Sequence, residues 1–224
     1  MADKPKITYL RGRGLAEVAR LIFAVQDVET TEEHITTKEE FQKLKATGKL
    51  MFNQLPLIEI DGLCLIESQA QGNYLGHKYN MLGKTDLERG RVQMLYAGSI
   101  SFRSVSGPGW FFMPTEAKAD AKKSAIEKAK TRYLPVFEKV LTENGTGFLV
   151  GSEATISDCA LFNILSEMKE MSEYHNILDD FPQCKAFVET FSAIPGVKKY
   201  LESPRRFPPP GDAYAKEAVN ALSP

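Results

Sequence analysis

The segment of residues 53–70 constrains the fold most strongly, because it joins a proline, two short apolar runs and a helix start. Pro56 has no N–H and forces Leu55 into an extended conformation. A proline that opens a strand stops the ladder there, so the backbone N–H and C=O of Leu55 stay free. Asp61-Gly62 then predicts a tight hairpin turn between two strands within residues 57–66.

A helix is predicted to begin directly after this hairpin. Ser68 and Gln71 have the Ser-x-x-Gln spacing of a capping box. A helix start presents free N–H groups and a partial positive charge, which suit a carboxylate. A free strand edge beside such a start can hold a small peptide by its backbone and one carboxylate end. An ordinary hairpin followed by a capped helix is the alternative, and the pattern alone favours it.

The first third of the chain predicts a small sheet covered by helices. Strand patterns alternate with helical patterns in the order β-α-β-α-β-β-α, which favours an α/β, thioredoxin-like domain. The expected elements are strands at 4–10 and 28–35, the hairpin strands, and helices ending near Val25, Ala46 and Tyr79. The turn after the first strand has no cysteine, so disulfide exchange by this chain is not expected.

The rest of the chain predicts helices alone, so we divide it into a domain at 1–81 and an all-α domain at 86–224. The helices are expected at 86–106, 115–144, 155–173, 181–193, 197–203 and 212–222. Residues 80–85 read as a linker. Thr37 with Glu40, and Thr155 with Asp158, are helix-start signals of the capping-box type.

Composition excludes several functions. The formal net charge is −1, which gives no general attraction to nucleic acid or to an anionic membrane. The first residues lack the apolar run of a signal peptide, and the three cysteines are too few and scattered for a disulfide framework. We therefore expect a cytoplasmic protein. The three histidines have no metal-ligand spacing, so no metal is expected.

Several motifs together resemble one known family. They are Tyr9 at the end of the first strand, Gln54-Leu55-Pro56, the Asp61-Gly62 hairpin, Glu67-Ser68, Arg132–Leu141, Phe148–Gly151, Thr155–Asp158 and Arg205–Gly211. This set is similar to the cytosolic glutathione transferases, most of all to the alpha class. The resemblance covers nearly the whole chain, and it implies a homodimeric enzyme that adds the glutathione thiolate to small apolar electrophiles.

The resemblance also implies a role for individual residues. Tyr9 would be the catalytic group, because its hydroxyl can donate a hydrogen bond to the glutathione thiolate and lower the pKa of the thiol. Pro56 would follow a cis peptide bond, and Leu55 would pair with the cysteinyl backbone. The other glutathione-binding residues would be Lys45 and Gln54 at the glycyl carboxylate, Ser68 at the γ-glutamyl carboxylate, and Arg132 from the partner subunit.

Three positions depart from the alpha-class pattern. Leu15 stands where an arginine is usual near the sulfur, so we expect Arg13 to supply the remaining positive field. Ser101 replaces an aspartate that reaches across the dimer, and Glu67 replaces a glutamine. We expect Glu67 to take over the ammonium group of the γ-glutamyl unit.

Two further expectations concern surfaces. Phe52, preceded by Met51, is expected to be a dimer contact that inserts into an apolar pocket of the other subunit. The electrophile pocket is expected to be bordered by Leu10 and the turn from Gly107 to Trp110. A carboxyl-terminal helix with a stripe of Tyr214, Ala218, Ala221 and Leu222 would form a mobile lid over that pocket.

Other functions fit the same residues. A non-catalytic homologue could carry apolar ligands or serve as a crystallin-like structural protein. A glutathione-dependent isomerase or peroxidase would share the whole thiol site. Retention of Tyr9 together with the peptide-binding set favours the transferase, and a rate measurement with glutathione and an aromatic electrophile would separate an enzyme from a carrier.

Overall fold

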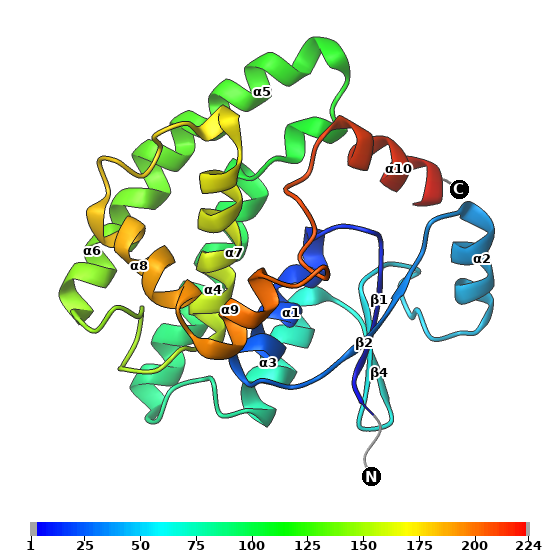
Figure 1. Cartoon of the computed structure of the whole chain (residues 1–224), viewed down its shortest axis with the longest axis horizontal. Coiled ribbons are helices and arrows are strands. Elements are labelled where there is room, and N and C mark those ends of the chain that lie inside the picture. The colour runs from blue at the N-terminus through cyan, green and yellow to red at the C-terminus, as the bar shows by residue number, and fades with distance from the viewer. Residues whose placement is uncertain (1–3, 223–224) are drawn as a thin grey trace.

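A computed structural model describes residues 4–222 (Figure 1). A small sheet with its covering helices forms one part of the molecule, and a bundle of helices forms the other. The predicted class is therefore confirmed: a thioredoxin-like α/β unit is followed by an all-helical unit. The predicted domain ranges include residues 1–3 and 223–224, which lie outside the described residues.

The sheet has four strands in the order β2-β1-β3-β4. Strand β1 (Lys6–Tyr9) runs parallel to β2 (Thr31–His34) and antiparallel to β3 (Leu57–Ile60), which pairs with β4 (Leu63–Leu65). Thr8 of β1 faces Leu57 of β3. This register places the end of β1, and hence Tyr9, beside the point where the chain leaves Pro56.

Three α-helices belong to the sheet unit: α1 (Glu17–Val25), α2 (Lys38–Ala46) and α3 (Ser68–Lys78), with a 3-10 turn, η1, at Gly14–Ala16. The predicted capping box of α2 is confirmed, because the Thr37 hydroxyl accepts from the Glu40 N–H at 3.2 Å and the Glu40 carboxylate accepts from the Thr37 N–H.

The predicted Ser68–Gln71 capping box is wrong. Ser68 is the first residue of α3, and Glu67 occupies the cap position without a side-chain hydrogen bond. The Gln71 amide instead donates to the carbonyls of Pro56 and Leu65, each at 2.8 Å. Because those two carbonyls have lost their ladder partners at the proline and the strand end, Gln71 satisfies them and ties the helix start to the hairpin.

The remaining elements are helical. They are α4 (Asp86–Ser106), η2 (Gly109–Phe112), α5 (Thr115–Lys128), a π-helical turn η3 (Ala129–Tyr133), α6 (Leu134–Asn144), α7 (Ile156–Glu170), η4 (Ser172–Tyr174), α8 (Pro182–Ser192), α9 (Pro195–Leu201) and α10 (Asp212–Leu222). The helix predicted over 115–144 is present but is interrupted by η3, just before Pro135, whose missing N–H cannot continue a regular ladder.

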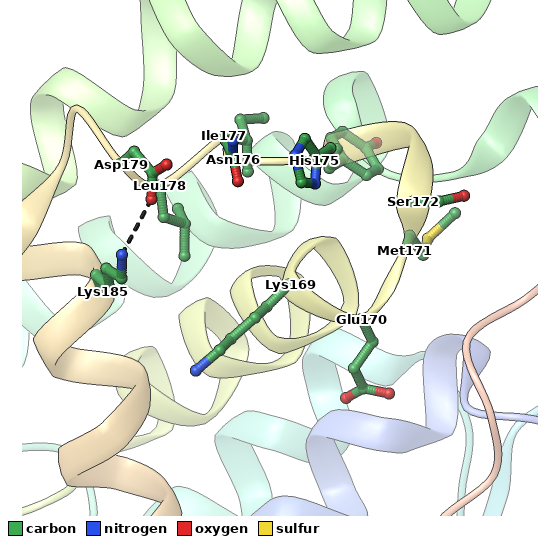
Figure 2. A pocket seen from close by; sticks show the side chains of 11 residues that line it. Lys169, Glu170, Met171, Ser172, His175, Asn176, Ile177, Leu178, Asp179 and Lys185 are labelled. Atoms are coloured by element: carbon green, nitrogen blue, oxygen red, sulfur yellow. Dashed lines mark hydrogen bonds and ion pairs between the residues drawn. The ribbon is translucent and has the colours of Figure 1, made fainter.

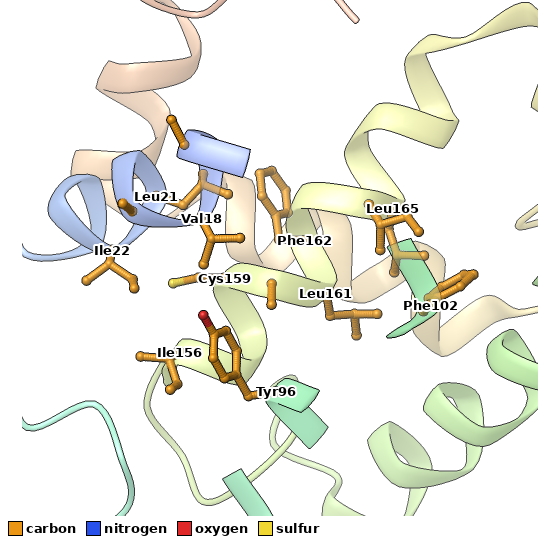
Figure 3. Close-up of a cluster of buried hydrophobic side chains, with 14 of the residues drawn as sticks. Val18, Leu21, Ile22, Tyr96, Phe102, Ile156, Cys159, Leu161, Phe162 and Leu165 are labelled. Carbon is orange, nitrogen blue, oxygen red and sulfur yellow. The ribbon is translucent and has the colours of Figure 1, made fainter. Parts of the chain in front are cut away.

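The two units share one hydrophobic core where α1, α4 and α7 meet (Figure 3). Val18 and Leu21 of α1 lie against Phe162 of α7, and Tyr96 and Phe102 approach from α4. Every residue of α1 from Glu17 to Ala24 is buried. A helix buried all round belongs to the interior of a larger body, so α1 packs on the sheet and the helical bundle at once.

A buried ionic network closes the same interface. Glu17 accepts hydrogen bonds from Tyr200 at 2.9 and 3.0 Å and pairs with Arg206 and Arg20. Burial alone raises the pKa of the Glu17 carboxyl, but Arg206 and the other arginines outweigh burial and hold that pKa below its usual value. Glu17 therefore stays charged and joins α1 to the carboxyl-terminal part of the chain.

None of the described helices, which lie within residues 4–222, is both long and apolar enough to cross a bilayer.

Candidate active site

Tyr9 ends β1 at the junction of the two units and is 7% exposed. Its hydroxyl oxygen accepts a hydrogen bond from the backbone N–H of Leu15 at 3.0 Å. This bond uses a lone pair of the oxygen and leaves the O–H hydrogen available to an acceptor. The arrangement therefore fixes the hydroxyl while it keeps its donor capacity.

Gly14 permits this arrangement. Its φ is +44°, and a Cβ built at this position would overlap the hydroxyl of Tyr9. A side chain at 14 would be strained by the backbone conformation and would also displace the tyrosine ring. Glycine is thus the residue that lets the 14–15 backbone approach the phenol.

Tyr9 lines a cavity of about 230 Å³ between the two units. Leu15 and Gly14 form the wall next to it, and Phe112 contributes an apolar side chain from η2. The other lining residues are Arg103, Pro108, Gly109, Pro210 and Tyr214. A mostly apolar cavity with a few polar groups at one end suits a small apolar molecule presented to a polar reagent.

Arg103 is the cationic residue of this lining and comes from the last turn of α4. Its guanidinium pairs with Glu167 of α7 at 3.3 Å, with side chains 19% and 1% exposed respectively. Burial alone would lower the pKa of Arg103, but Glu167, Tyr9 and Tyr214 more than compensate and raise that pKa. Arg103 is therefore permanently charged at the cavity.

Tyr214 of α10 closes the cavity from the carboxyl-terminal side. Burial, together with the neighbouring Tyr9 phenol, raises the pKa of the Tyr214 phenol. Its ring meets Phe112 edge-on at 6.2 Å between centroids, and a Cβ on Gly12 would overlap it. The segment at α10 packs against both α2 and η2, so it bridges the two units (Figure 1).

The residues predicted to border the electrophile pocket do not all line the cavity of Tyr9. Tyr214 lines the Tyr9 cavity, whereas Leu10 lines a neighbouring one of about 200 Å³ that also contains Tyr214. Trp110 is buried against Tyr174 with ring centroids 5.4 Å apart. The buried face of α10 is Ala215, Ala218 and Ala221, and Leu222 is 38% exposed.

Gly107 acts on the cavity through the backbone. Its N–H donates to the Arg103 carbonyl at 2.8 Å and ends α4, and a Cβ at 107 would overlap that carbonyl oxygen. The glycine thus allows the chain to turn closely over the last turn of α4, which carries Arg103. Pro108 and Gly109 then continue into the cavity wall.

The peptide-binding segment has the predicted backbone. The Leu55–Pro56 peptide bond is cis, as the resemblance implied. Leu55 is half-buried beside the buried Pro56, and Gln54 is exposed. Since β3 begins only at Leu57, the backbone of Leu55 lies outside the ladder.

Glu67 and Ser68 stand at the start of α3. Glu67 is exposed and has φ +63°, a left-handed conformation that is costly for a residue with a side chain. Ser68 is half-buried, and its carbonyl accepts from the Tyr96 hydroxyl at 3.3 Å. Strain of this kind occurs where the surroundings fix a backbone for binding, so it marks this helix start as a candidate anion site.

The remaining predicted residues are Lys45 and Arg132 of the glutathione site and Met51 and Phe52 of the dimer contact. The Lys45 ammonium lies over the ring of Phe41 at 5.0 Å, on the last turn of α2. Arg132 is exposed in the π-helical turn, with its guanidinium over Tyr133 at 5.0 Å. Met51 and Phe52 are 78% and 61% exposed.

Arg13 is 3% exposed and is held by both units. Its Nε donates to the Phe207 carbonyl at 2.5 Å, and its guanidinium pairs with Glu170 at the end of α7. It is not among the residues that line the Tyr9 cavity. Part of its charge is therefore neutralised by Glu170 before it can act on a ligand.

A larger cavity, of about 410 Å³, lies at the end of α7 and does not include any predicted site residue (Figure 2). Lys185 and Asp179 form an ion pair at its edge at 3.0 Å, and His175 lies near Ser172. Tyr9 does not line this cavity but lines the smaller one described above, so volume alone does not locate the reactive site.

Comparison with known proteins agrees with this geometry. Residues 5–77 match the glutathione S-transferase N-terminal domain, and residues 104–204 match the C-terminal domain of the same family. The chain is 39% identical to glutathione S-transferase A4 of Mus musculus over 223 residues, with 99% of each chain covered. It is also 39% identical to glutathione S-transferase A3 of Homo sapiens over 225 residues, again with 99% of each covered.

The fold agrees as well. The glutathione S-transferase of Ascaris lumbricoides superposes with a TM-score of 0.78 at 30% identity, covering 89% of this chain and 96% of that one. The chain therefore belongs to the glutathione S-transferase family. Its similarity to A-type relatives over the whole length places it with the alpha class, as the motifs predicted.

Proposed function

We propose that this glutathione transferase activates its co-substrate through Tyr9, whose hydroxyl donates a hydrogen bond to the glutathione thiolate. A free thiol is mostly protonated at neutral pH, and the thiolate is the nucleophile. The fixed hydroxyl beside a cavity between the two units is the observation that supports this role. The sulfur then attacks the electrophilic carbon, and the leaving group departs with the bonding electron pair.

The tripeptide lies along the edge next to the cis-proline in this proposal. Leu55 pairs with the cysteinyl backbone, and Ser68 with the free N–H groups of α3 holds the γ-glutamyl carboxylate. Glu67 accepts from the γ-glutamyl ammonium group. The remaining contacts are assigned to Gln54, Lys45, Pro56 and, from a partner subunit, Arg132.

A homodimer is part of the proposal. Phe52 and Met51 project from the loop before the cis-proline, and apolar side chains this exposed suit burial against another protein. The same association would bring the partner's exposed arginine at position 132 toward the tripeptide.

The electrophile is assigned to the cavity of Tyr9, with α10 as its lid. Tyr214, Phe112 and Leu15 provide the surface that contacts an apolar substrate. Pro208–Gly211 separates α10 from the rest of the chain, and a helix of this length is marginal unless it packs. Arg13 is assigned a contribution to the positive field near the sulfur. The protein is assigned to the cytoplasm.

The experiment that tests the proposal is the rate of conjugation of glutathione to an aromatic electrophile by the native protein and by Tyr9→Phe. Fast turnover by the native protein and slow turnover by the variant support it. A native protein that binds glutathione without turnover would instead indicate a ligand carrier.

A further inference from the structure

The cavity of Tyr9 lacks a cation on the wall where the alpha-class resemblance expects one. Leu15 holds that position, and its side chain is 50% exposed at the cavity. Arg11 lines the neighbouring cavity, and Arg13 is occupied by Glu170 and Phe207. The hydrogen bond from the neutral Tyr9 phenol and the partly neutralised charge of Arg13 are then the interactions assigned so far to the thiolate.

Arg103 supplies a positive charge to this cavity from the opposite unit. It lines the same cavity as Tyr9 and Tyr214, although it comes from α4 rather than from the sheet. Within residues 4–222, the buried Nε of Arg103 has no hydrogen-bond partner. Because this Nε is buried, Arg103 acts on the cavity through its charge, which lies close enough to Tyr9 and Tyr214 for both phenols to raise its pKa.

The partner of Arg103 lies behind it. Glu167 is 1% exposed and is not among the lining residues, so the arginine is the member of the pair that meets the cavity. Burial raises the pKa of the Glu167 carboxyl, and Arg103 opposes that rise without cancelling it. The pair consequently presents its positive end to the space in front of Tyr9.

We propose that Arg103 provides the positive field that stabilises the bound glutathione thiolate, in place of an arginine at position 15, and that Glu167 moderates this field. Arg103 is a positioning and electrostatic residue here, and the proposal rests on the proposed function of Tyr9. An opposite charge at a few ångströms stabilises a thiolate and lowers the pKa of the thiol.

Other charged and titratable groups act on the same pair, and each is left unchanged except in the variant that tests it. From α1 and the loop before it come Glu17 and Arg13, from η4 Tyr174, and from the carboxyl-terminal part Arg206 and Tyr214. Arg206 is a matched control, because it is also a buried, ion-paired arginine, does not line the cavity and acts on Glu167 more weakly than Arg103 does.

The test is a pH titration of glutathione bound to the full protein, followed by the ultraviolet absorbance of the thiolate. Glu167→Gln removes the moderating charge and keeps the cation, so it lowers the pKa of bound glutathione. Arg103→Gln combined with Glu167→Gln replaces the ion pair by two neutral amides, so no charge is left buried without a partner. We expect about a tenfold smaller thiolate fraction at neutral pH in the double variant.

Three further variants separate the charge of Arg103 from its shape and from the charges of other arginines. Arg103→Lys keeps the charge, so its thiolate fraction at neutral pH should stay close to that of the native protein and above that of the double variant. Arg206→Gln should leave the titration close to that of the native protein. Arg13→Ala should raise the pKa of bound glutathione less than the double variant does.

The proposal is overturned if the double variant titrates like the native protein, or if Glu167→Gln and the double variant move the pKa in the same direction. Tyr9→Phe is titrated alongside. An unchanged titration in Tyr9→Phe refutes the role of Tyr9, while a shift there with an unchanged double variant refutes the role of Arg103 alone.

Discussion

The Leu15 N–H donates to the hydroxyl oxygen of Tyr9 at 3.0 Å, so the residue that lacks the expected charge still positions the phenol. Position 15 therefore contributes through its backbone, and its side chain is free to differ. The charge contribution at this site has to come from elsewhere, and the apolar Leu15 side chain becomes part of the cavity wall.

Removal of the Tyr9 hydroxyl should lower turnover. We expect Tyr9→Phe to reduce kcat by about tenfold or more, because the charge-assisted hydrogen bond to the thiolate is lost. The affinity for glutathione should change little, since the tripeptide is held mainly by its backbone and carboxylates. Steady-state kinetics check this, with Tyr74→Phe, which loses a surface phenol bonded to Asp61, as the control. Turnover near that of the native protein would contradict the assignment.

Glu67 should contribute to binding of the tripeptide. Glu67→Gln keeps the size of the side chain and removes the charge proposed to meet the γ-glutamyl ammonium, so affinity for glutathione should fall by about fivefold to tenfold. Turnover at saturation should change less. Calorimetric titration of glutathione measures the affinity, and Glu189→Gln on α8 removes a distant exposed charge as a control. Equal affinity in Glu67→Gln and the native protein would refute the role.

Phe52 should stabilise the dimer. Its side chain is 61% exposed in the single chain, and a buried aromatic anchor can contribute about 2 kcal/mol or more to association. Phe52→Ser should therefore shift sedimentation toward a monomer at low protein concentration, while Val136→Ser, another exposed apolar position on α6, should not. A Phe52→Ser protein that stays fully dimeric on dilution would rule out this contact.

Deletion of residues 212–224 should weaken the binding of bulky apolar conjugates by about tenfold. The deletion removes Tyr214 from the cavity and exposes the surfaces of η2 and α2 that α10 covers. Glutathione itself should bind nearly as before, because none of its proposed contacts lies on α10. Competition binding with glutathione and with a bulky conjugate measures both effects, and unchanged conjugate affinity would mean that α10 is not a lid.

Stability should depend on pH through Asp158. This carboxyl is buried at the start of α7 and accepts from the N–H groups of Leu149 and Thr155, each at 2.8 Å. Burial raises its pKa from 3.8 to about 6, against the effect of those hydrogen bonds. The folded protein thus binds more protons than the unfolded chain between these values, so this contribution to the free energy of unfolding falls as pH rises from 3.8 to about 6.

Denaturant unfolding of the native protein and Asp158→Asn at pH values across that window checks the sign. The native protein should lose more stability than the variant as pH rises through the window, because asparagine does not titrate. Parallel curves would contradict the assignment of the shifted carboxyl to this residue.

Much of the fold follows from local signals in the sequence. Helix α4 begins and ends at the predicted residues, since Thr85 and Glu88 form a capping box and Gly107 ends the last turn. Thr155 and Asp158 likewise begin α7 as predicted. These signals act within a few residues, so a single sequence contains the information that they need.

The features that the sequence did not predict depend on distant partners. The Gln71 side chain does not form the expected capping box, because its amide donates to the carbonyls of Pro56 and Leu65. Arg103 looks like an ordinary helix residue until α7 brings Glu167 to it, and no spacing rule joins positions so far apart. Phe112 and Pro210 line the same cavity although they are distant in sequence, so no local pattern could join them either.

The burial of α1 on every side limits how this protein can be divided or recombined. A fragment that ended at the linker would expose the face of α1 that lies on α7 and leave Glu17 without Arg206. Chimaeras that exchange the helical unit with that of a relative must therefore carry matching residues on α1. The interface between the two units thus determines which parts of two transferases can be combined.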